Sequence, residues 1–278
     1  MRIVLLGTGG PRPDLRRHGP AIAVQVGDAH LLFDAGRGVV RQLVRAGVPL
    51  ARVGPVFVTH HHYDHIGDLA DVILTTWLQG RPGALRVFGP EGMTDIVAAL
   101  VERVYAKDIA FRSRGEPAVG GWKPVEARDV GAGLVCEGAG WRVSAEEVVH
   151  GHGLGIAGFR WVCLGYRLEA EGKAVAISGD TIDCDGLDRL ARGADVLVQC
   201  CYLADAEITD PHAERLARYV HTTSSVVGKI AARNGVGTLV LTHFREKSAV
   251  LMRSLEADVR RDWAGPLVLG EDLAVIDV

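Results

Sequence analysis

A cluster of three histidines and one aspartate constrains this chain more than any other segment. His60, His62, Asp64 and His65 lie within six residues, directly after the apolar run 56–58, which predicts a buried strand. Imidazole suits zinc, copper, iron and nickel, and carboxylate extends the choice to harder ions. A histidine-rich exposed loop is the alternative. The density of ligand-type side chains after a strand favours a metal site, and one tight turn can serve two adjacent ions.

Further candidate ligands follow apolar runs later in the chain. Asp180 follows the run 174–177 and His243 follows the run 238–241, and each run predicts a strand. An aspartate in such a place can also cap a helix or form a turn, and a histidine can be an ordinary core residue. His150 and His152 form a second His-x-His pair, and either side chain could reach the first ion.

The form His-x-His-x-Asp-His after a strand resembles the signature of the metallo-β-lactamase superfamily of binuclear metallohydrolases. Other landmarks of that family occur in the same order, beginning with the glycine turn at 7–10 and the Asp-x-Gly turn at 34–36. The resemblance implies one ion on His60, His62 and His150, a second ion on Asp64, His65 and His243, and Asp180 between them. It aligns His150 with the family position in preference to His152.

The resemblance also implies cofactors and a reaction. Two Zn²⁺ ions are expected, with Mn²⁺ or iron as alternatives. Two ions about 3.5–4 Å apart can share a hydroxide that attacks an ester bond. Asp64 would orient this nucleophile or accept its proton.

A further histidine opens the segment 221–225, His-Thr-Thr-Ser-Ser. It resembles the segment that the ribonuclease Z and arylsulfatase-like branches place beside the metals, which implies that His221 donates a hydrogen bond or proton to the substrate. An ordinary helix start is the alternative. Those branches often carry His-Glu where this chain has Gln199 and Cys200, so the usual carboxylate partner is absent. A different acid, such as Asp205 or Glu214, is a candidate substitute that the sequence alone does not place.

The choice of branch rests on charge and on local similarity. The net charge is −3 and the isoelectric point about 6.4, whereas a surface that grips RNA concentrates positive charge. The segment 112–124 is short and of mixed charge. The segments 77–90 and 93–104 resemble the arylsulfatase-like branch. We therefore predict hydrolysis of a small phosphate, sulfate or carboxylic ester, with nucleic acid as the less favoured partner.

Three alternatives remain for the function. The first is a transfer-RNA 3′-processing endonuclease of the ribonuclease Z type. The second is a non-hydrolytic redox or sensor protein that binds iron on the same fold. The third is a metal-binding protein that has lost turnover. A fourth possibility, a dinucleotide-binding loop at Gly7–Gly10, is disfavoured because the fingerprint requires a glycine where this chain has Arg12.

Apolar runs and amphipathic stretches predict an α/β fold, the αββα sandwich in which two mixed sheets are flanked by helices. Strands are predicted at 2–6, 21–26, 31–33, 56–58, 85–88, 174–177, 195–198, 238–242 and 267–269. Helices are predicted near 37–46, 93–105, 213–219 and 226–234. We expect residues 1–278 to form one domain. The pocket walls are expected around Trp77, Phe111, Phe159, Trp161 and Phe244.

Composition indicates what class of protein this is and in which compartment we expect it. The chain is 48% hydrophobic and 23% charged, which is enough for a large core. Its five cysteines include no C-x-x-C pair, so a disulfide framework is not expected. No apolar stretch reaches the roughly 18 residues of a membrane span. We therefore expect a soluble cytoplasmic protein without membrane contact, and a homodimer at the level of the family.

Overall fold

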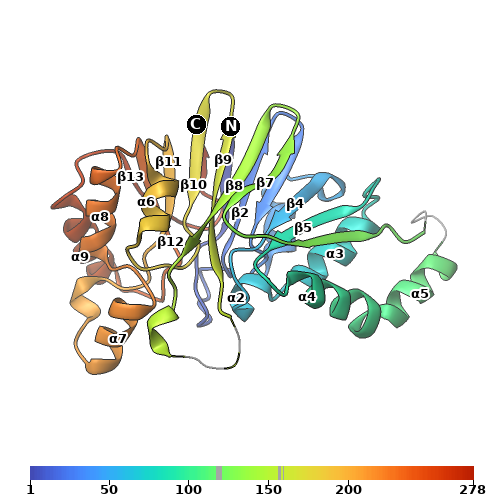
Figure 1. The fold of residues 1–278 in the computed structure, drawn as a ribbon, viewed down its shortest axis with the longest axis horizontal. Coiled ribbons are helices and arrows are strands. Elements are labelled where there is room, and N and C mark those ends of the chain that lie inside the picture. Colours follow the sequence, from blue (N-terminus) through green and yellow to red (C-terminus); the bar gives the residue numbers. More distant parts are fainter. Residues whose placement is uncertain (117–120, 156–157, 159) are drawn as a thin grey trace.

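The computed structural model describes residues 1–116, 121–155, 158 and 160–278. Two seven-stranded sheets lie face to face, and helices cover both outer faces (Figure 1). The first sheet has the order β14-β1-β2-β3-β4-β5-β6, and the second has the order β13-β12-β11-β10-β9-β8-β7. The predicted αββα sandwich is confirmed.

The strands of the first sheet are β1 (Arg2–Gly7), β2 (Ala21–Val26), β3 (Ala29–Phe33), β4 (Val53–Phe57), β5 (Leu85–Gly89), β6 (Val125–Asp129) and β14 (Val275–Asp277). Those of the second are β7 (Gly133–Gly138), β8 (Trp141–Val148), β9 (Cys163–Ala170), β10 (Lys173–Ile177), β11 (Val196–Cys200), β12 (Thr238–Thr242) and β13 (Leu267–Leu269). The α-helices are α1 (Val39–Arg45), α2 (Tyr63–Ile66), α3 (Leu69–Leu78), α4 (Met93–Ala99), α5 (Ala106–Gly115), α6 (Asp185–Ala191), α7 (Pro211–Tyr219), α8 (Ser224–Arg233) and α9 (Ala249–Arg260). Short helical turns are η1 (Leu50–Arg52), η2 (Leu100–Val104), η4 (His152–Leu154) and η5 (Asp205–Glu207).

Each sheet is parallel on one side and antiparallel on the other. In the first sheet β3, β4, β5 and β6 run parallel, and in the second β10, β11, β12 and β13 do so. Parallel strands end at the same edge of a sheet, and the loops at that edge are where open α/β folds place their ligands. The topology therefore brings together loops that are distant in the sequence.

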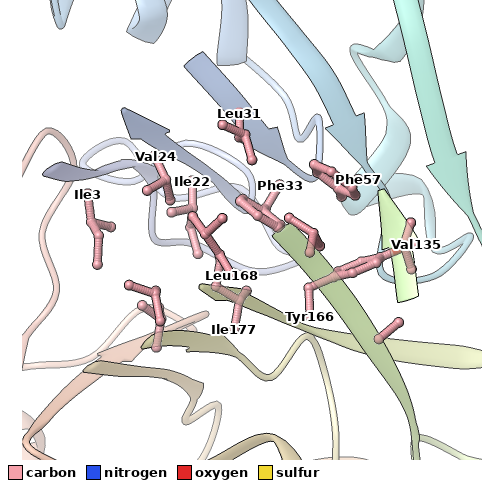
Figure 2. Close-up of a cluster of buried hydrophobic side chains, with 14 of the residues drawn as sticks. Ile3, Ile22, Val24, Leu31, Phe33, Phe57, Val135, Tyr166, Leu168 and Ile177 are labelled. Atoms are coloured by element: carbon pink, nitrogen blue, oxygen red, sulfur yellow. The ribbon is translucent and has the colours of Figure 1, made fainter. Parts of the chain in front are cut away.

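The space between the sheets is filled by large apolar side chains (Figure 2). Phe33 stacks on Phe57 with ring centroids 5.0 Å apart, and Tyr166 from the second sheet tilts against both rings. The Tyr166 hydroxyl donates a hydrogen bond of 2.7 Å to the Val58 carbonyl. This contact ties the second sheet to the chain just before the histidine cluster.

Each outer helical layer packs on its own sheet. Helix α3 shows why: Leu69, Val72, Ile73, Thr76 and Trp77 are buried, and this spacing places them on one face of a helix. Leu69, Val72 and Ile73 pack on the first sheet with α1 and α4, and α6, α8 and α9 pack on the second. None of the described helices combines the length and apolar character needed to cross a bilayer.

The predicted elements are all found, but the prediction was incomplete. Each of the nine predicted strands and four predicted helices overlaps an observed element. The strands β6, β7, β8, β9 and β14 were missed. In β8 the buried residues alternate with exposed or partly exposed ones, so no continuous apolar run marks the strand.

Candidate metal centre

Six of the predicted ligands form two clusters in which every residue but His62 is buried, and the seventh lies between them. In the first cluster His62 Nδ1 lies 3.0 Å from His60 Nε2 and 3.1 Å from His150 Nε2. His62 is the one exposed member. Each residue offers one ligand atom, and these atoms and one from Asp180 all lie within 4.8 Å of one another.

The second cluster consists of Asp64, His65 and His243. His243 Nε2 lies 3.3 Å from His65 Nε2 and 3.4 Å from Asp64 Oδ2. Asp180 Oδ2 lies 3.2 Å from His243 Nε2 and 3.5 Å from His65 Nε2. It also lies 4.0 Å from His60 Nε2, in the first cluster. Asp180 thus faces both clusters with the same oxygen.

Strand ends position these side chains. The chain leaves β4 and enters the single turn α2, which carries Asp64 and His65. His150 follows β8, Asp180 follows β10 and His243 follows β12. All of these loops lie at the same end of the sandwich, near α2 in Figure 1.

A second layer of polar groups fixes the ligand rings. Asp34 Oδ2 accepts a hydrogen bond of 2.8 Å from His65 Nδ1, and Asp34 Oδ1 accepts one of 2.7 Å from the Thr59 amide. The Thr59 hydroxyl also contacts His60 Nδ1 at 3.0 Å. Such partners orient histidine ligands and leave the other ring nitrogen for the metal. Asp34 is the residue that sequence reasoning missed as a functional group, although the Asp-x-Gly turn was a landmark.

The structure separates the two residues of the second His-x-His pair. His150 is buried, and its Nδ1 donates a hydrogen bond of 2.7 Å to the Val220 carbonyl. His152 is exposed, and its Nδ1 accepts a hydrogen bond from the His150 amide at 3.0 Å. His150 therefore belongs to the first cluster, and His152 supports the backbone beside it.

The shifted pKa values of the residues in and beside the first cluster favour binding of a cation. Burial lowers the pKa of His150 to about 4 and holds the pKa of His60 well below its ordinary value. Both rings are therefore neutral near pH 7 and offer a lone pair. Burial alone would raise the pKa of Asp180, but His243 and His65 hold it well below its ordinary value, so Asp180 is a carboxylate.

The second cluster fits a cation for a related reason. Burial alone would lower the pKa of His65, but Asp34 and Asp180 raise it well above its ordinary value. The carboxylates of Asp34 and Asp180 therefore stabilise a positive charge at this ring. The same two carboxylates would stabilise a bound metal cation. Asp180 Oδ1 is buried and has no hydrogen-bond partner among the described residues. Since buried polar atoms are normally paired, this oxygen supports a bound ion as its partner.

His221 lies beside the clusters without either predicted acid. Its Nδ1 is 3.9 Å from Asp180 Oδ2, and Cys200 joins these two residues in a third buried group. Asp205 instead accepts hydrogen bonds from Ser224 and the Ser225 amide, and Glu214 is exposed. Neither of these two candidate acids is therefore the carboxylate partner of His221.

An aromatic ring packs on His221 instead. The Tyr202 ring stacks on the His221 imidazole, with centroids 4.6 Å apart and an angle of 27° between the planes. Burial holds the pKa of His221 well below its ordinary value, so the imidazole is neutral near pH 7. Its Nδ1 has no hydrogen-bond partner in the described part of the chain.

The glycine turn after β1 packs closely against His243 and Tyr202 at the candidate metal centre. A Cβ atom on Gly10 would lie 3.1 Å from His243 Cε1 and 3.2 Å from the Tyr202 ring. The Phe244 amide donates a hydrogen bond to the Thr8 carbonyl at 2.8 Å. The turn is thus packed against the His243 loop, which agrees with the argument against a dinucleotide loop.

Most of the predicted pocket walls are wrong. Trp77 is a buried residue of α3, and its ring packs on Trp122. Phe244 is buried among the apolar residues between the second sheet and the helices α6, α8 and α9. Phe111 is exposed on α5. Phe159 lies outside the described residues. Trp161 alone among the described four lies at the centre, where its ring tilts over His62 at 4.9 Å.

Comparisons with known proteins place the chain in a family. Residues 29–244 match the family model described as Beta-lactamase superfamily domain. A ribonuclease Z from Mycolicibacterium paratuberculosis (strain ATCC BAA-968 / K-10) is 35% identical over 289 aligned positions, which cover 100% of this chain and 98% of the relative. The ribonuclease Z of Mycobacterium bovis (strain BCG / Pasteur 1173P2) is 32% identical, with the same coverage.

Solved structures share the fold at lower identity. The short form of human tRNase Z superposes with a TM-score of 0.74 and 21% identity, covering 100% of this chain and 99% of that one. The preference for the arylsulfatase-like branch is not supported, because the curated relatives described above carry the name of the alternative. The chain belongs to the metallo-β-lactamase superfamily, in its ribonuclease Z-like branch.

Proposed function

We propose that this protein is a metal-dependent phosphodiesterase that cleaves RNA, with transfer-RNA precursors as its substrate class. The observation that carries the proposal is the position of Asp180 Oδ2, 3.2 Å from His243 Nε2 and 3.9 Å from His150 Nε2, between two clusters of buried ligand-type atoms. Similarity over the full chain to proteins named ribonuclease Z supports the choice of RNA. The earlier preference for a small ester is therefore replaced by the RNA alternative.

Each of the predicted ligands has a proposed role in holding the metal ions or activating water. His60, His62 and His150 would hold one ion, Asp64, His65 and His243 would hold the other, and Asp180 would contact both. We assign zinc as the ion to test first, because these two clusters offer imidazole and carboxylate without thiolate, with Mn²⁺ or iron as alternatives. Two ions bound there would supply Lewis-acid polarisation of the phosphodiester and would acidify a water molecule. Asp64 would accept or orient the proton of that water.

His221 is proposed to act on the phosphate. Its unpaired, buried Nδ1 lies beside Asp180, where a phosphate bridging the clusters would come within reach. The ring is neutral and its plane is fixed by Tyr202, so its single N–H can donate one hydrogen bond to a phosphate oxygen without the cost of reorientation.

Helix α5 is the proposed second contact with RNA. None of its residues is buried, and it extends from the body beyond α4 (Figure 1). Lys107 and Arg114 are exposed on it, whereas Arg112 is paired with Asp108 and Glu116. Exposed cations on a projecting helix suit the RNA backbone, whose binding is dominated by phosphate contacts.

The test is cleavage of a precursor transfer RNA with a 3′ trailer by protein whose metal content has been measured. We expect release of the trailer, and we expect Asp180→Asn to reduce the rate by at least about a hundredfold. His212→Ala is the matched control, since His212 is exposed on α7, and it should retain the rate within about twofold.

Two outcomes would contradict the proposal. A protein with full metal content that leaves precursor RNA intact but turns over bis(4-nitrophenyl) phosphate or an aryl sulfate is a small-ester hydrolase. Bound iron with oxygen chemistry and no hydrolysis would indicate the redox alternative.

A further inference from the structure

We propose that a pocket beside the first cluster binds a flat aromatic ring attached to the reacting phosphate, either a nucleobase or the aryl group of an ester. We call it the Trp161 pocket. Its volume is about 330 Å³, and its walls include His62, Tyr63, His150, Leu154, Trp161 and Val220. The inference rests on the proposed function in one respect only, that the reacting group is a phosphate ester.

The pocket opens directly onto the proposed reaction centre. His62 and His150 line the pocket and are also members of the first cluster, with His62 Nδ1 and His150 Nε2 3.1 Å apart. His150 Nε2 lies 3.9 Å from Asp180 Oδ2. A phosphate at the clusters and a ring in the pocket can therefore belong to one molecule without a long linker.

Trp161 is held in place before any ligand arrives. Its Nε1 donates a hydrogen bond of 2.8 Å to the His150 carbonyl. Its ring lies 4.9 Å from the His62 ring at an angle of 41°, and edge-on to His60 at 6.1 Å. Because the indole is already ordered by these contacts, Trp161 loses little conformational entropy when a ring stacks on it.

The chemistry of the walls selects an uncharged ring. Among the described residues that line the pocket none is a lysine, arginine, aspartate or glutamate, so a second phosphate would find no counter-ion there. Leu154 and Val220 supply apolar surface, and Trp161 supplies an aromatic face. Stacking of bases on aromatic side chains is a common mode of binding single-stranded nucleic acid and tolerates different bases.

Tyr63 forms the outer edge of the pocket. Its side chain is 58% exposed, yet its hydroxyl donates a hydrogen bond to the Pro11 carbonyl. The Arg37 guanidinium lies 5.6 Å from its ring. A ligand that enters past this edge meets a second aromatic side chain whose position is also fixed.

The experiment measures binding by calorimetry to metal-loaded protein of known metal content. The ring-bearing probes are adenosine 3′-monophosphate, adenosine 5′-monophosphate and phenyl phosphate, and ribose 5-phosphate is the probe without a ring. We expect wild type to bind at least one ring-bearing probe about tenfold or more tighter than ribose 5-phosphate. Trp161→Leu should abolish this preference, Trp161→Phe should keep most of it, and both should bind ribose 5-phosphate within about twofold of wild type.

Trp122→Leu is the matched control, because the Trp122 ring packs on Trp77 in the first helical layer. A preference for nucleotides over phenyl phosphate identifies a nucleobase as the occupant, and an equal preference identifies any aryl ring. The proposal is overturned if Trp161→Leu keeps the preference, or if it weakens ribose 5-phosphate to the same extent. Failure to cleave precursor RNA would leave this result intact, so the two proposals fail separately.

Discussion

Asp34 and His65 are joined by a hydrogen bond of 2.8 Å from His65 Nδ1 to Asp34 Oδ2. The bond sets the direction of the opposite ring nitrogen, which faces Asp180 and His243. Asp34 has a positive φ of 60°, a conformation that aspartate and asparagine adopt more readily than most residues. The backbone at the end of β3 is thus bent so that one carboxylate can hold the His65 ring, which comes from a different loop.

Asp34→Asn should weaken metal binding without disturbing the backbone, because asparagine tolerates the same φ but lacks the charge that supports His65. Loss of such a partner typically costs about 10–100-fold in metal affinity. Chelator competition measures the effect, and Asp28→Asn, an exposed change beyond β2, is the control. Unchanged affinity in Asp34→Asn would show that the carboxylate has no part in metal binding.

His150→Ala and His152→Ala should differ although the residues are two positions apart. His150 is buried in the first cluster and His152 is exposed. We expect elemental analysis of His150→Ala to show about one metal ion per chain in place of about two, and His152→Ala to keep the wild-type content. The reverse pattern would exchange their roles.

A buried ion pair near the centre should make stability depend on pH. The Lys247 ammonium contacts the Glu207 carboxylate, and the two side chains are 1% and 3% exposed. Removing one partner of a buried pair costs about 3–5 kcal/mol, so Glu207→Gln should lower the free energy of unfolding by about 3 kcal/mol. Lys173→Met, which breaks a half-exposed pair with Asp195, should cost about 0–1 kcal/mol.

The sign of the pH effect follows from Glu207. Burial alone would raise its pKa, but Lys247 and Arg245 hold the pKa below its ordinary value. The stabilisation is therefore complete above the ordinary glutamate pKa of about 4.3 and is lost as the pH falls through the lower pKa of the folded state. Urea titrations of wild type and Glu207→Gln should converge in acid. A gap that stays constant to pH 3 contradicts this account.

The double variant Lys107→Glu with Arg114→Glu tests helix α5. It should weaken binding of precursor RNA and flatten the dependence of log affinity on log salt by about one to two units, since each phosphate contact contributes about 0.7–0.9. Arg41→Glu with Arg253→Glu, on the exposed surfaces of α1 and α9, is the control with the same change in charge. Equal loss in both variants would indicate a general effect of charge, not a contact on α5.

The sequence predicted those parts of the centre that local patterns encode. Four ligand-type residues fall within the six positions 60–65 after β4, and Asp180 and His243 follow strands that contain the apolar runs 174–177 and 239–241. The contact between Asp34 and His65 depends on parallel pairing of β3 with β4, which no local pattern reveals. The walls around the centre were mostly wrong for the same reason, since the sequence does not show that Trp77 packs on Trp122 while Trp161 packs on His62.

Both chain ends lie at the pole of the sandwich away from α2 (Figure 1), and the Val278 amide donates a hydrogen bond to the Met1 carbonyl at 3.0 Å. A tether, tag or fused protein attached at either end would therefore leave the ligand-bearing loops uncovered. Because the ends touch, a short linker could also join them, and the chain could be reopened elsewhere as a circular permutant.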